Sequence, residues 1–291
     1  MLVYANVSHS RRDRTPLAGE ARAQSVRAEG AGKRATLCDR LALPLAPSRK
    51  REGEPQALPV LASPACGRGN MKYAPHMDLY EALYTTRAMR RVKPDPVPTD
   101  VIKQMVDAAI RAPSGSNSQN WRMVAVTDHD QRTALGKLYG EAWELLQDQM
   151  YAGARQKAEA AGDEQMLRIM SSSAWLGEHF GEVPLVVLFF DRNDPSGGSI
   201  YPAVWSLQLA ARGQGVGTTL TTILGFFRQD EVFQLLGVPA GKGWQLRAAV
   251  PCGYPLGNWG VAQRRPAHEV TFSDAWGEAP PWTIYEPMWD A

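Results

Sequence analysis

Cysteine is scarce in this chain of 291 residues. Cys38 and Cys66 precede residue 71 and Cys252 alone follows it, so no disulfide can form within residues 71–291. This usage predicts a reducing, cytoplasmic location. Apolar runs near the ~20 residues of a membrane-spanning helix are missing too, so we expect no membrane partner.

Motifs for metal binding and for nucleophilic catalysis are also missing. The five histidines are scattered without an H-E-x-x-H motif or paired cysteines, so no metal site is predicted. Ser114 lies in no G-x-S-x-G motif, which disfavours a serine hydrolase. The glycine-rich run 213–217 follows a predicted helix rather than a strand, so we expect it to end that helix rather than bind a dinucleotide.

Basic charge is concentrated in the first 70 residues, which hold 12 Lys and Arg against 6 Asp and Glu. These residues lack apolar periodicity, and we expect a disordered basic extension. Its acidic residues disfavour a transit peptide. Two interpretations stay open: translation begins near Met71 or Met77, or residues 1–70 are a genuine disordered tail.

The remaining part, residues 71–291, is the predicted folded domain. It keeps 20 of the 32 basic residues and 24 of the 30 acidic ones, so it is mildly acidic. The basic extension also lacks interleaved aromatic residues. Both features disfavour a nucleic-acid partner.

Helix and strand signals mix along residues 71–291 without a regular βαβ alternation, which predicts an α+β fold. Asp78 is placed to cap a first helix and Thr99 a second. Further helices are predicted in 131–178, 200–211 and 229–236, and strands at 121–126, 185–190, near 217–222 and at 245–250. The apolar strand 185–190 is expected to be buried on both faces.

Two polar segments indicate a ligand site. Arg87, Arg90 and Arg91 crowd three guanidinium groups into five residues, and arginine is well shaped to bind phosphate through paired donors. The run 112–122 (APSGSNSQNWR) follows and mixes turn-forming residues with amide and hydroxyl groups that can recognise a heterocycle. We therefore expect a phosphorylated ligand.

Four segments, taken in order, resemble the nitroreductase family of FMN-dependent oxidoreductases. They are TTRAMRR at 85–91, APSGSNSQNW at 112–121, the stretch from SIYPAV at 199 through GVGT at 215–218, and GYP at 253–255 followed by RRP at 264–266. Their joint order and spacing span residues 71–291, and residues 1–70 lie outside the resemblance.

The resemblance implies a homodimer with a mixed, mainly antiparallel sheet flanked by helices, FMN at the subunit interface and a C-terminal arm that embraces the partner. By this resemblance, the phosphate of FMN would be held by Arg87, Arg90, Arg264 and Arg265. The loop at 113–119 would line the ring and ribityl groups. Backbone donors near the hydride-accepting nitrogen of the ring would come from Thr221 and Thr222. The implied FMN-binding residues are Arg87, Ala88, Arg90, Pro113, Ser114, Gly115, Asn117, Gln119, Thr221, Thr222, Arg264 and Arg265.

Some positions depart from the family pattern. Thr86 stands where the family often has Arg, and Ala88 replaces a frequent Ser, which weakens the expected phosphate contacts. Trp205 and Ser206 replace a frequent Gln-Asn pair. Trp205 either reshapes the substrate cleft or packs at the interface, and its large apolar area favours packing.

The implied activity is transfer of hydride from NADH or NADPH to FMN, followed by two-electron reduction of a small-molecule acceptor such as a nitroaromatic, a quinone or a conjugated enone. The chemistry belongs to the flavin, so no catalytic side chain is nominated. Alternatives are a flavin-storing protein without turnover and a reductive dehalogenase or flavin-fragmenting relative.

The C-terminal tail, residues 279–291, is rich in aromatic and other apolar side chains, among them Trp282, Tyr285, Met288 and Trp289. Exposing this much apolar surface to water is unfavourable. We expect the tail to pack on its own domain or on a second subunit.

Overall fold

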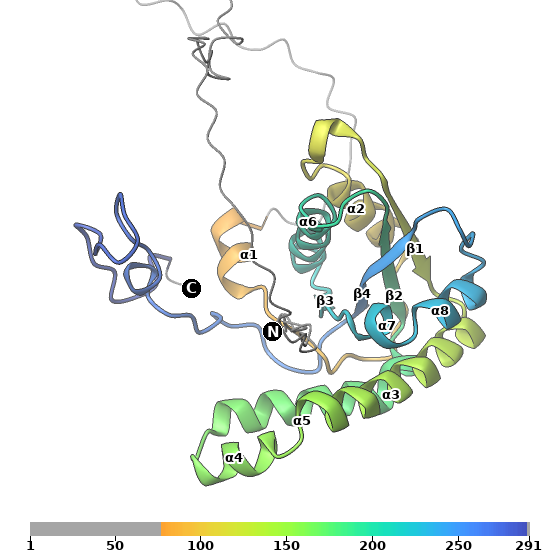
Figure 1. Cartoon of the computed structure of the whole chain (residues 1–291), viewed down its shortest axis with the longest axis horizontal. Coiled ribbons are helices and arrows are strands. Elements are labelled where there is room, and N and C mark those ends of the chain that lie inside the picture. The colour runs from red at the N-terminus through yellow and green to blue at the C-terminus, as the bar shows by residue number, and fades with distance from the viewer. Residues whose placement is uncertain (1–76, 290–291) are drawn as a thin grey trace, which may run out of the picture. The chain divides into compact units, whose positions relative to one another are not determined.

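Strand β2 (Leu185–Asp191) is buried along its whole length. This confirms the expectation from its uninterrupted apolar run, which can be shielded from water only when both faces are covered. The structure is a computed structural model that describes residues 77–289 (Figure 1). The predictions for residues 1–70 lie outside the described residues.

The sheet has four strands in the order β1-β2-β4-β3, and each neighbouring pair is antiparallel. The other strands are β1 (Trp121–Val126), β3 (Gly217–Thr218) and β4 (Gln245–Gly253). An isolated parallel bridge joins Ala88 to Thr218. The α+β class with a mainly antiparallel sheet is therefore confirmed, although the strand expected near 217–222 is only two residues long.

Helices cover both faces of the sheet (Figure 1). On one face α2 and α6 pack against Leu185, Val187 and Phe189 of β2. On the other face α3, α5, α7 and α8 pack against Val186, Leu188 and Phe190. The helices are α2 (Thr99–Ala109), α3 (His129–Met150), α5 (Glu164–His179), α6 (Ile200–Gly213), α7 (Ile223–Phe227) and α8 (Gln229–Leu236). The sequence pattern missed the five-residue helix α7.

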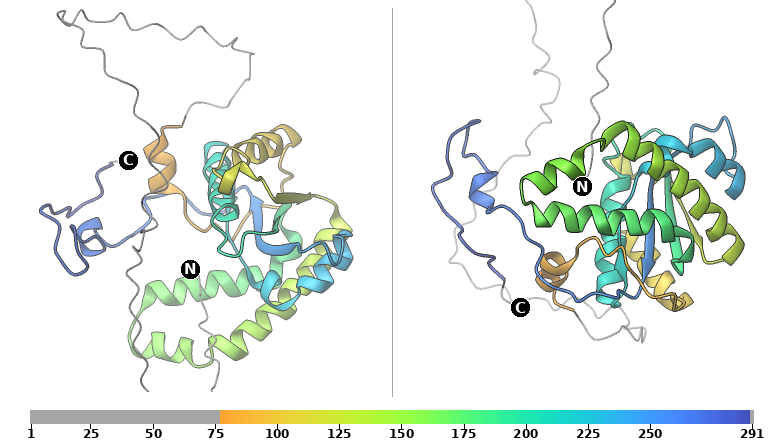
Figure 2. Two further views of the ribbon diagram at one scale, coloured as in Figure 1. Left: turned by 45° about the horizontal axis from the view of Figure 1, so that its top comes forward. Right: turned by 90° about the horizontal axis from the view of Figure 1, so that it is seen from below.

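The helical region predicted at 131–178 is divided into three helices, with α4 (Ala154–Ala160) between α3 and α5. The chain turns where Gly153 and Gly162 adopt left-handed φ angles of 73° and 63°, which glycine adopts at low cost. Helix α5 returns along α3 (Figure 2). Across residues 77–289, no helix is both long and apolar enough to cross a bilayer.

The first two helices differ in how they begin. Asp78 caps α1 (Leu79–Thr85) as predicted, because its Oδ1 accepts hydrogen bonds from Tyr80 N at 2.8 Å and Glu81 N at 3.3 Å. The capping role predicted for Thr99 was wrong: Thr99 is already helical and Pro98 occupies the cap position without a side-chain bond. Proline is favourable there because its φ is fixed and it needs no N–H partner.

Helix α1 leaves much of its apolar side uncovered. Ala82 is buried, but Leu79 and Leu83 are 62% and 38% exposed. Tyr80 is also exposed. Within the described residues, this helix therefore presents an apolar surface to solvent.

Glycine at position 136 is required by close helix packing. An added Cβ would lie 2.6 Å from the backbone nitrogen of Gly181, whereas at Gly140, one turn later in α3, the nearest atom is Gly177 O at 3.5 Å. We expect Gly136→Ala to destabilise the chain by about 1–3 kcal/mol through overpacking. Gly140→Ala should be neutral or stabilising by up to about 1 kcal/mol, since alanine favours helix. Urea unfolding of the full chain measures both, and equal midpoints for the two variants would contradict this packing.

Candidate functional site

The loop predicted to line a flavin follows α2 and is exposed from Gly115 to Gln119. Three of its non-glycine residues have left-handed φ angles: Ser116 at 52°, Asn117 at 51° and Gln119 at 48°. Such conformations cost roughly 1–3 kcal/mol each and gather at binding sites. Gln119 Nε2 donates to Asn117 Oδ1 at 3.0 Å, which presents both amides on one side of the loop turn.

This loop is held against the start of α6. Gly115 N donates to Ser199 Oγ at 3.3 Å, and Ser199 is the N-cap residue of α6. Within the loop, Gln119 N donates to Ser114 Oγ at 3.3 Å. Pro113, Ser114, Gly115, Asn117 and Gln119 therefore form one local unit, and their role in binding FMN stays a prediction.

The predicted arginine segment lies at the opposite edge of the sheet. Met89 N donates to Thr218 O at 2.9 Å, and Ala88 bridges Thr218 of β3. Arg87 is exposed and donates from Nη2 to Asn258 O at 2.7 Å. The bridge thus fixes Arg87 and Ala88 beside the edge strand.

The three arginines do not form one free cluster. Arg90 Nη1 donates to Ser172 Oγ at 3.2 Å and Arg91 Nη2 donates to Ser171 Oγ at 3.3 Å, both on α5. Burial lowers the pKa of the Arg90 guanidinium, although interactions with Tyr139 and Tyr151 raise it. Arginine still keeps its charge at neutral pH, so Arg90 is a half-buried cation.

Thr221 follows β3 in the chain and, like β3, pairs with β4. Its N–H donates to Ala249 O at 3.0 Å, and its carbonyl accepts from Ala249 N at 2.8 Å. The backbone-donor role expected of Thr221 is therefore already committed to the sheet. The Thr221 hydroxyl accepts a hydrogen bond from Tyr139 at 3.3 Å. Thr222 follows as the N-cap residue of α7.

Arg264 and Arg265 lie on the segment that leaves β4 and passes α1. Ala262 N donates to Tyr84 O at 2.9 Å, which anchors this segment near the end of α1. Both arginines are exposed, and Arg264 Nη1 donates to Gln263 O at 2.8 Å. They are therefore placed on the same edge of the domain as Arg87.

The predicted site residues thus form two groups in one chain. The loop group, residues 113–119, precedes edge strand β1 and lies at the start of α6. The arginine–threonine group, made up of Arg87, Ala88, Arg90, Thr221 and Thr222, adjoins edge strand β3, just beyond the end of α6. Three strand spacings separate the edges by about 14 Å, and the 14-residue α6 spans about 20 Å. A single chain does not bring the two groups together.

Two buried hydroxyls beside the arginine–threonine group have no hydrogen-bond partner in the described part of the chain: Thr86 Oγ1 and Thr219 Oγ1. An unsatisfied buried polar atom costs about 1–3 kcal/mol. The exposed Arg87 beside them gives this edge positive charge. Such a donor set suits an anionic, hydrogen-bonding ligand.

Sequence reasoning missed Arg212, which joins three segments next to this group. Arg212 is only 7% exposed; its Nε donates to Thr85 Oγ1 at 2.8 Å and its Nη2 to Glu81 Oε1 at 3.1 Å. Its guanidinium also stacks 4.3 Å from the centre of the Trp259 ring. Burial lowers the pKa of Arg212, and Glu81 opposes that effect. The only sequence signal was a charged residue inside an apolar helical pattern.

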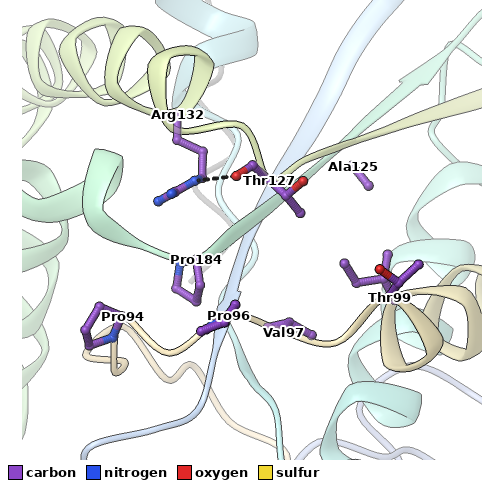
Figure 3. A pocket seen from close by; sticks show the side chains of 9 residues that line it. Pro94, Pro96, Val97, Thr99, Ala125, Thr127, Arg132 and Pro184 are labelled. Carbon is purple, nitrogen blue, oxygen red and sulfur yellow. Dashed lines mark hydrogen bonds between the residues drawn. The ribbon is translucent and has the colours of Figure 1, made fainter.

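A cavity of about 380 Å³ lies elsewhere, between the start of α2 and the start of α3 (Figure 3). Its lining residues are Pro94, Pro96, Val97, Thr99, Ile102, Ala125, Thr127, Arg132 and Pro184. None of the predicted site residues is among them. Arg132 donates to three backbone carbonyls there, from Thr127, Gly181 and Val183, which indicates a structural role.

Comparison with known proteins identifies the family. The family model named "Nitroreductase family" matches residues 83–254, more than half of the chain. The chain belongs to the nitroreductase family. The match includes the loop group and the arginine–threonine group.

Individual relatives of this nitroreductase-family chain are distant. It is 26% identical over 215 residues to "NADH dehydrogenase" of Thermus thermophilus, covering 67% of this chain and 96% of that protein. It is 26% identical over 190 residues to rat "Iodotyrosine deiodinase 1", covering 61% of this chain and 62% of that protein. The chain thus spans less than two thirds of the rat relative's length.

The solved structure of the FMN-dependent nitroreductase NfnB from Mycobacterium smegmatis, in complex with NADPH, shares the fold. The TM-score is 0.53 at 22% identity, covering 67% of this chain and 97% of that structure. This similarity confirms the nitroreductase fold expected from the four segments.

Within residues 77–289 of this nitroreductase-family chain, no group of three or more potential metal ligands occurs.

The interactions of Arg212 predict that its substitution lowers the stability of this nitroreductase-family chain. Lysine cannot keep the bonds to Thr85 and Glu81 and the stacking on Trp259 at once. We expect Arg212→Lys to lower the free energy of unfolding by on the order of 2 kcal/mol, because buried polar partners are left unsatisfied. Arg168→Lys, in an exposed pair with Glu164, is the control and should change it by less than about 0.5 kcal/mol. Equal denaturation midpoints for both variants would contradict a structural role of Arg212.

Proposed function

We propose that this chain is an FMN-dependent oxidoreductase that accepts hydride from NADH or NADPH and reduces a small-molecule acceptor. The observation that carries the proposal is the division of the predicted FMN residues into two polar groups on opposite edges of a nitroreductase fold. The arginine–threonine group offers positive charge for the phosphate, and the loop group offers hydrogen-bonding side chains for the ring and the ribityl chain. A second copy of the chain brings the complementary half to each edge.

The proposed homodimer also accounts for the exposed apolar side chains. Leu79 and Leu83 of α1 would be covered, together with Trp205, which is 40% exposed on α6. In the tail, Trp289 lies 5.8 Å from the Tyr84 ring, whereas Tyr285 and Met288 are exposed. Apolar surface of this kind favours burial in an interface. We propose that the C-terminal arm embraces the partner.

In the proposed site the exposed Arg87, Arg264 and Arg265 bind the phosphate, and Arg90 adds positive charge from its half-buried position. The loop group of the other copy, with its amides already oriented by the left-handed turn, contacts the ring and the ribityl chain. Bound FMN supplies the hydride chemistry itself. The chain orients the ring and places positive charge and hydrogen-bond donors where the reduced ring carries negative charge.

Nitroaromatics and quinones are the proposed acceptors, because they take two electrons from a reduced flavin. Relatives named iodotyrosine deiodinase make reductive dehalogenation the alternative. Storage of flavin without turnover is a second alternative. We propose the folded domain as residues 71–291, which contain the family match at 83–254, and the cytoplasm as its location.

Anaerobic absorbance spectra of the purified full chain with FMN test this function. We expect a bound flavin spectrum that bleaches on addition of NADH or NADPH and returns when a nitroaromatic or a quinone is added. Arg264→Ala combined with Arg265→Ala should weaken FMN binding at least tenfold, since charged hydrogen bonds contribute about 1.5–3 kcal/mol each. Arg155→Ala, in an exposed α4 pair with Glu159, is the matched control.

Each other outcome has a distinct meaning. Flavin that binds but never bleaches would favour storage, and recovery of the oxidised spectrum with 3-iodotyrosine but not with quinones would favour dehalogenation. Failure of the full chain to bind FMN would contradict the proposed function altogether.

A further inference from the structure

Tyr139 is a buried tyrosine whose hydroxyl reaches the arginine–threonine group from α3. It is 4% exposed, and its ring stacks on Phe180 with centres 4.0 Å apart and an interplanar angle of 14°. Its hydroxyl donates to Thr221 Oγ1 at 3.3 Å. The stacked ring leaves the hydroxyl little freedom, so it approaches Thr221 from a fixed direction.

The environment keeps this hydroxyl protonated. Burial raises the pKa of Tyr139, and the nearby charge of Arg90 opposes this effect in part. The net effect is upward from an ordinary value near 10, so Tyr139 remains a hydrogen-bond donor at neutral pH. At neutral pH the Tyr139 hydroxyl therefore carries the proton that its bond to Thr221 Oγ1 needs.

Thr221 has one hydrogen left to donate. A threonine hydroxyl provides one donor and two acceptor positions. Because both backbone polar groups of Thr221 pair with Ala249 and its oxygen accepts from Tyr139, its own hydroxyl hydrogen is available to a ligand. Thr221 itself is half-buried, so part of the residue remains open to contact with a ligand.

We propose that Tyr139 is a positioning residue that acts through Thr221: it fixes the Thr221 hydroxyl as a donor toward the bound flavin. The proposal rests on the proposed function and adds a residue that contacts no ligand itself. Without Tyr139, the Thr221 hydroxyl is free to rotate and can accept as readily as it donates. With Tyr139, one orientation is favoured and the donated bond is strengthened by polarisation along the chain of hydroxyls.

The test is a double-mutant cycle on the FMN-loaded full chain. Tyr139→Phe keeps the stacked ring and removes only the hydroxyl, and Thr221→Val removes its acceptor. We expect Tyr139→Phe to slow single-turnover reduction of bound FMN by NADPH by roughly three- to tenfold, the range for loss of one hydrogen bond. It should also shift the midpoint potential and the visible absorption band of the bound flavin.

The decisive result is the coupling between Tyr139→Phe and Thr221→Val. In the Thr221→Val background, Tyr139→Phe should change neither the potential nor the rate, because its effect passes through Thr221. Thr221→Ser retains the hydroxyl and should restore the sensitivity to Tyr139→Phe. A merely structural role would alter thermal stability but would leave the potential unchanged.

The control is Tyr201→Phe, which removes another partly buried tyrosine hydroxyl, bonded to Arg247 O on the α6 side of the sheet. It should leave the flavin potential unchanged. An unchanged potential in Tyr139→Phe, or an equal shift with and without Thr221, would overturn the inference. If the wild-type chain binds no FMN, the proposed function itself fails, which is a separate outcome.

Discussion

Burial of β2 on both faces is the constraint on which the rest of the structure depends. A strand with apolar side chains in both directions needs helices on each side, and α2 and α6 cover one face while α3 and α5 cover the other. Strand β2 therefore occupies the interior of the sheet, with β1 beyond it on one side and β4 and β3 on the other. The two polar groups follow these edges and are kept apart by the same core.

The arginine–threonine group is built from segments far apart in sequence. The Ala88–Thr218 bridge joins the segment after α1 to β3, Arg212 joins α1 to α6 and to Trp259, and Tyr139 reaches Thr221 from α3. Apart from the stacking of Arg212 on Trp259, these links are hydrogen bonds in partly or fully buried surroundings, where such bonds are strong and their loss is costly. These links join the segments of this edge within one chain.

The sequence predicts those features that depend on local pattern. The apolar run of β2, the Asp78 cap and the turn-forming residues at 113–119 each follow from neighbouring residues alone. It does not predict that Thr221 N–H is already paired with Ala249, that Arg90 and Arg91 bond to α5, or that Arg212 and Tyr139 reach the site. The Thr221–Ala249 pair joins residues 28 positions apart, and the other contacts join residues 80 to 131 positions apart, which no local period encodes.

The central proposal is that each FMN site combines the arginine–threonine group and Arg264 of one chain with the loop group of another. Mixed dimers test it most directly: one chain carries Arg87→Ala with Arg264→Ala, and the other carries Ser114→Ala with Asn117→Ala. Neither variant alone should retain FMN. A dimer purified through two different tags should regain one intact site and half of the wild-type flavin content. If the two groups served one site within each chain, both sites of the mixed dimer would stay damaged, and its lack of flavin would contradict the account.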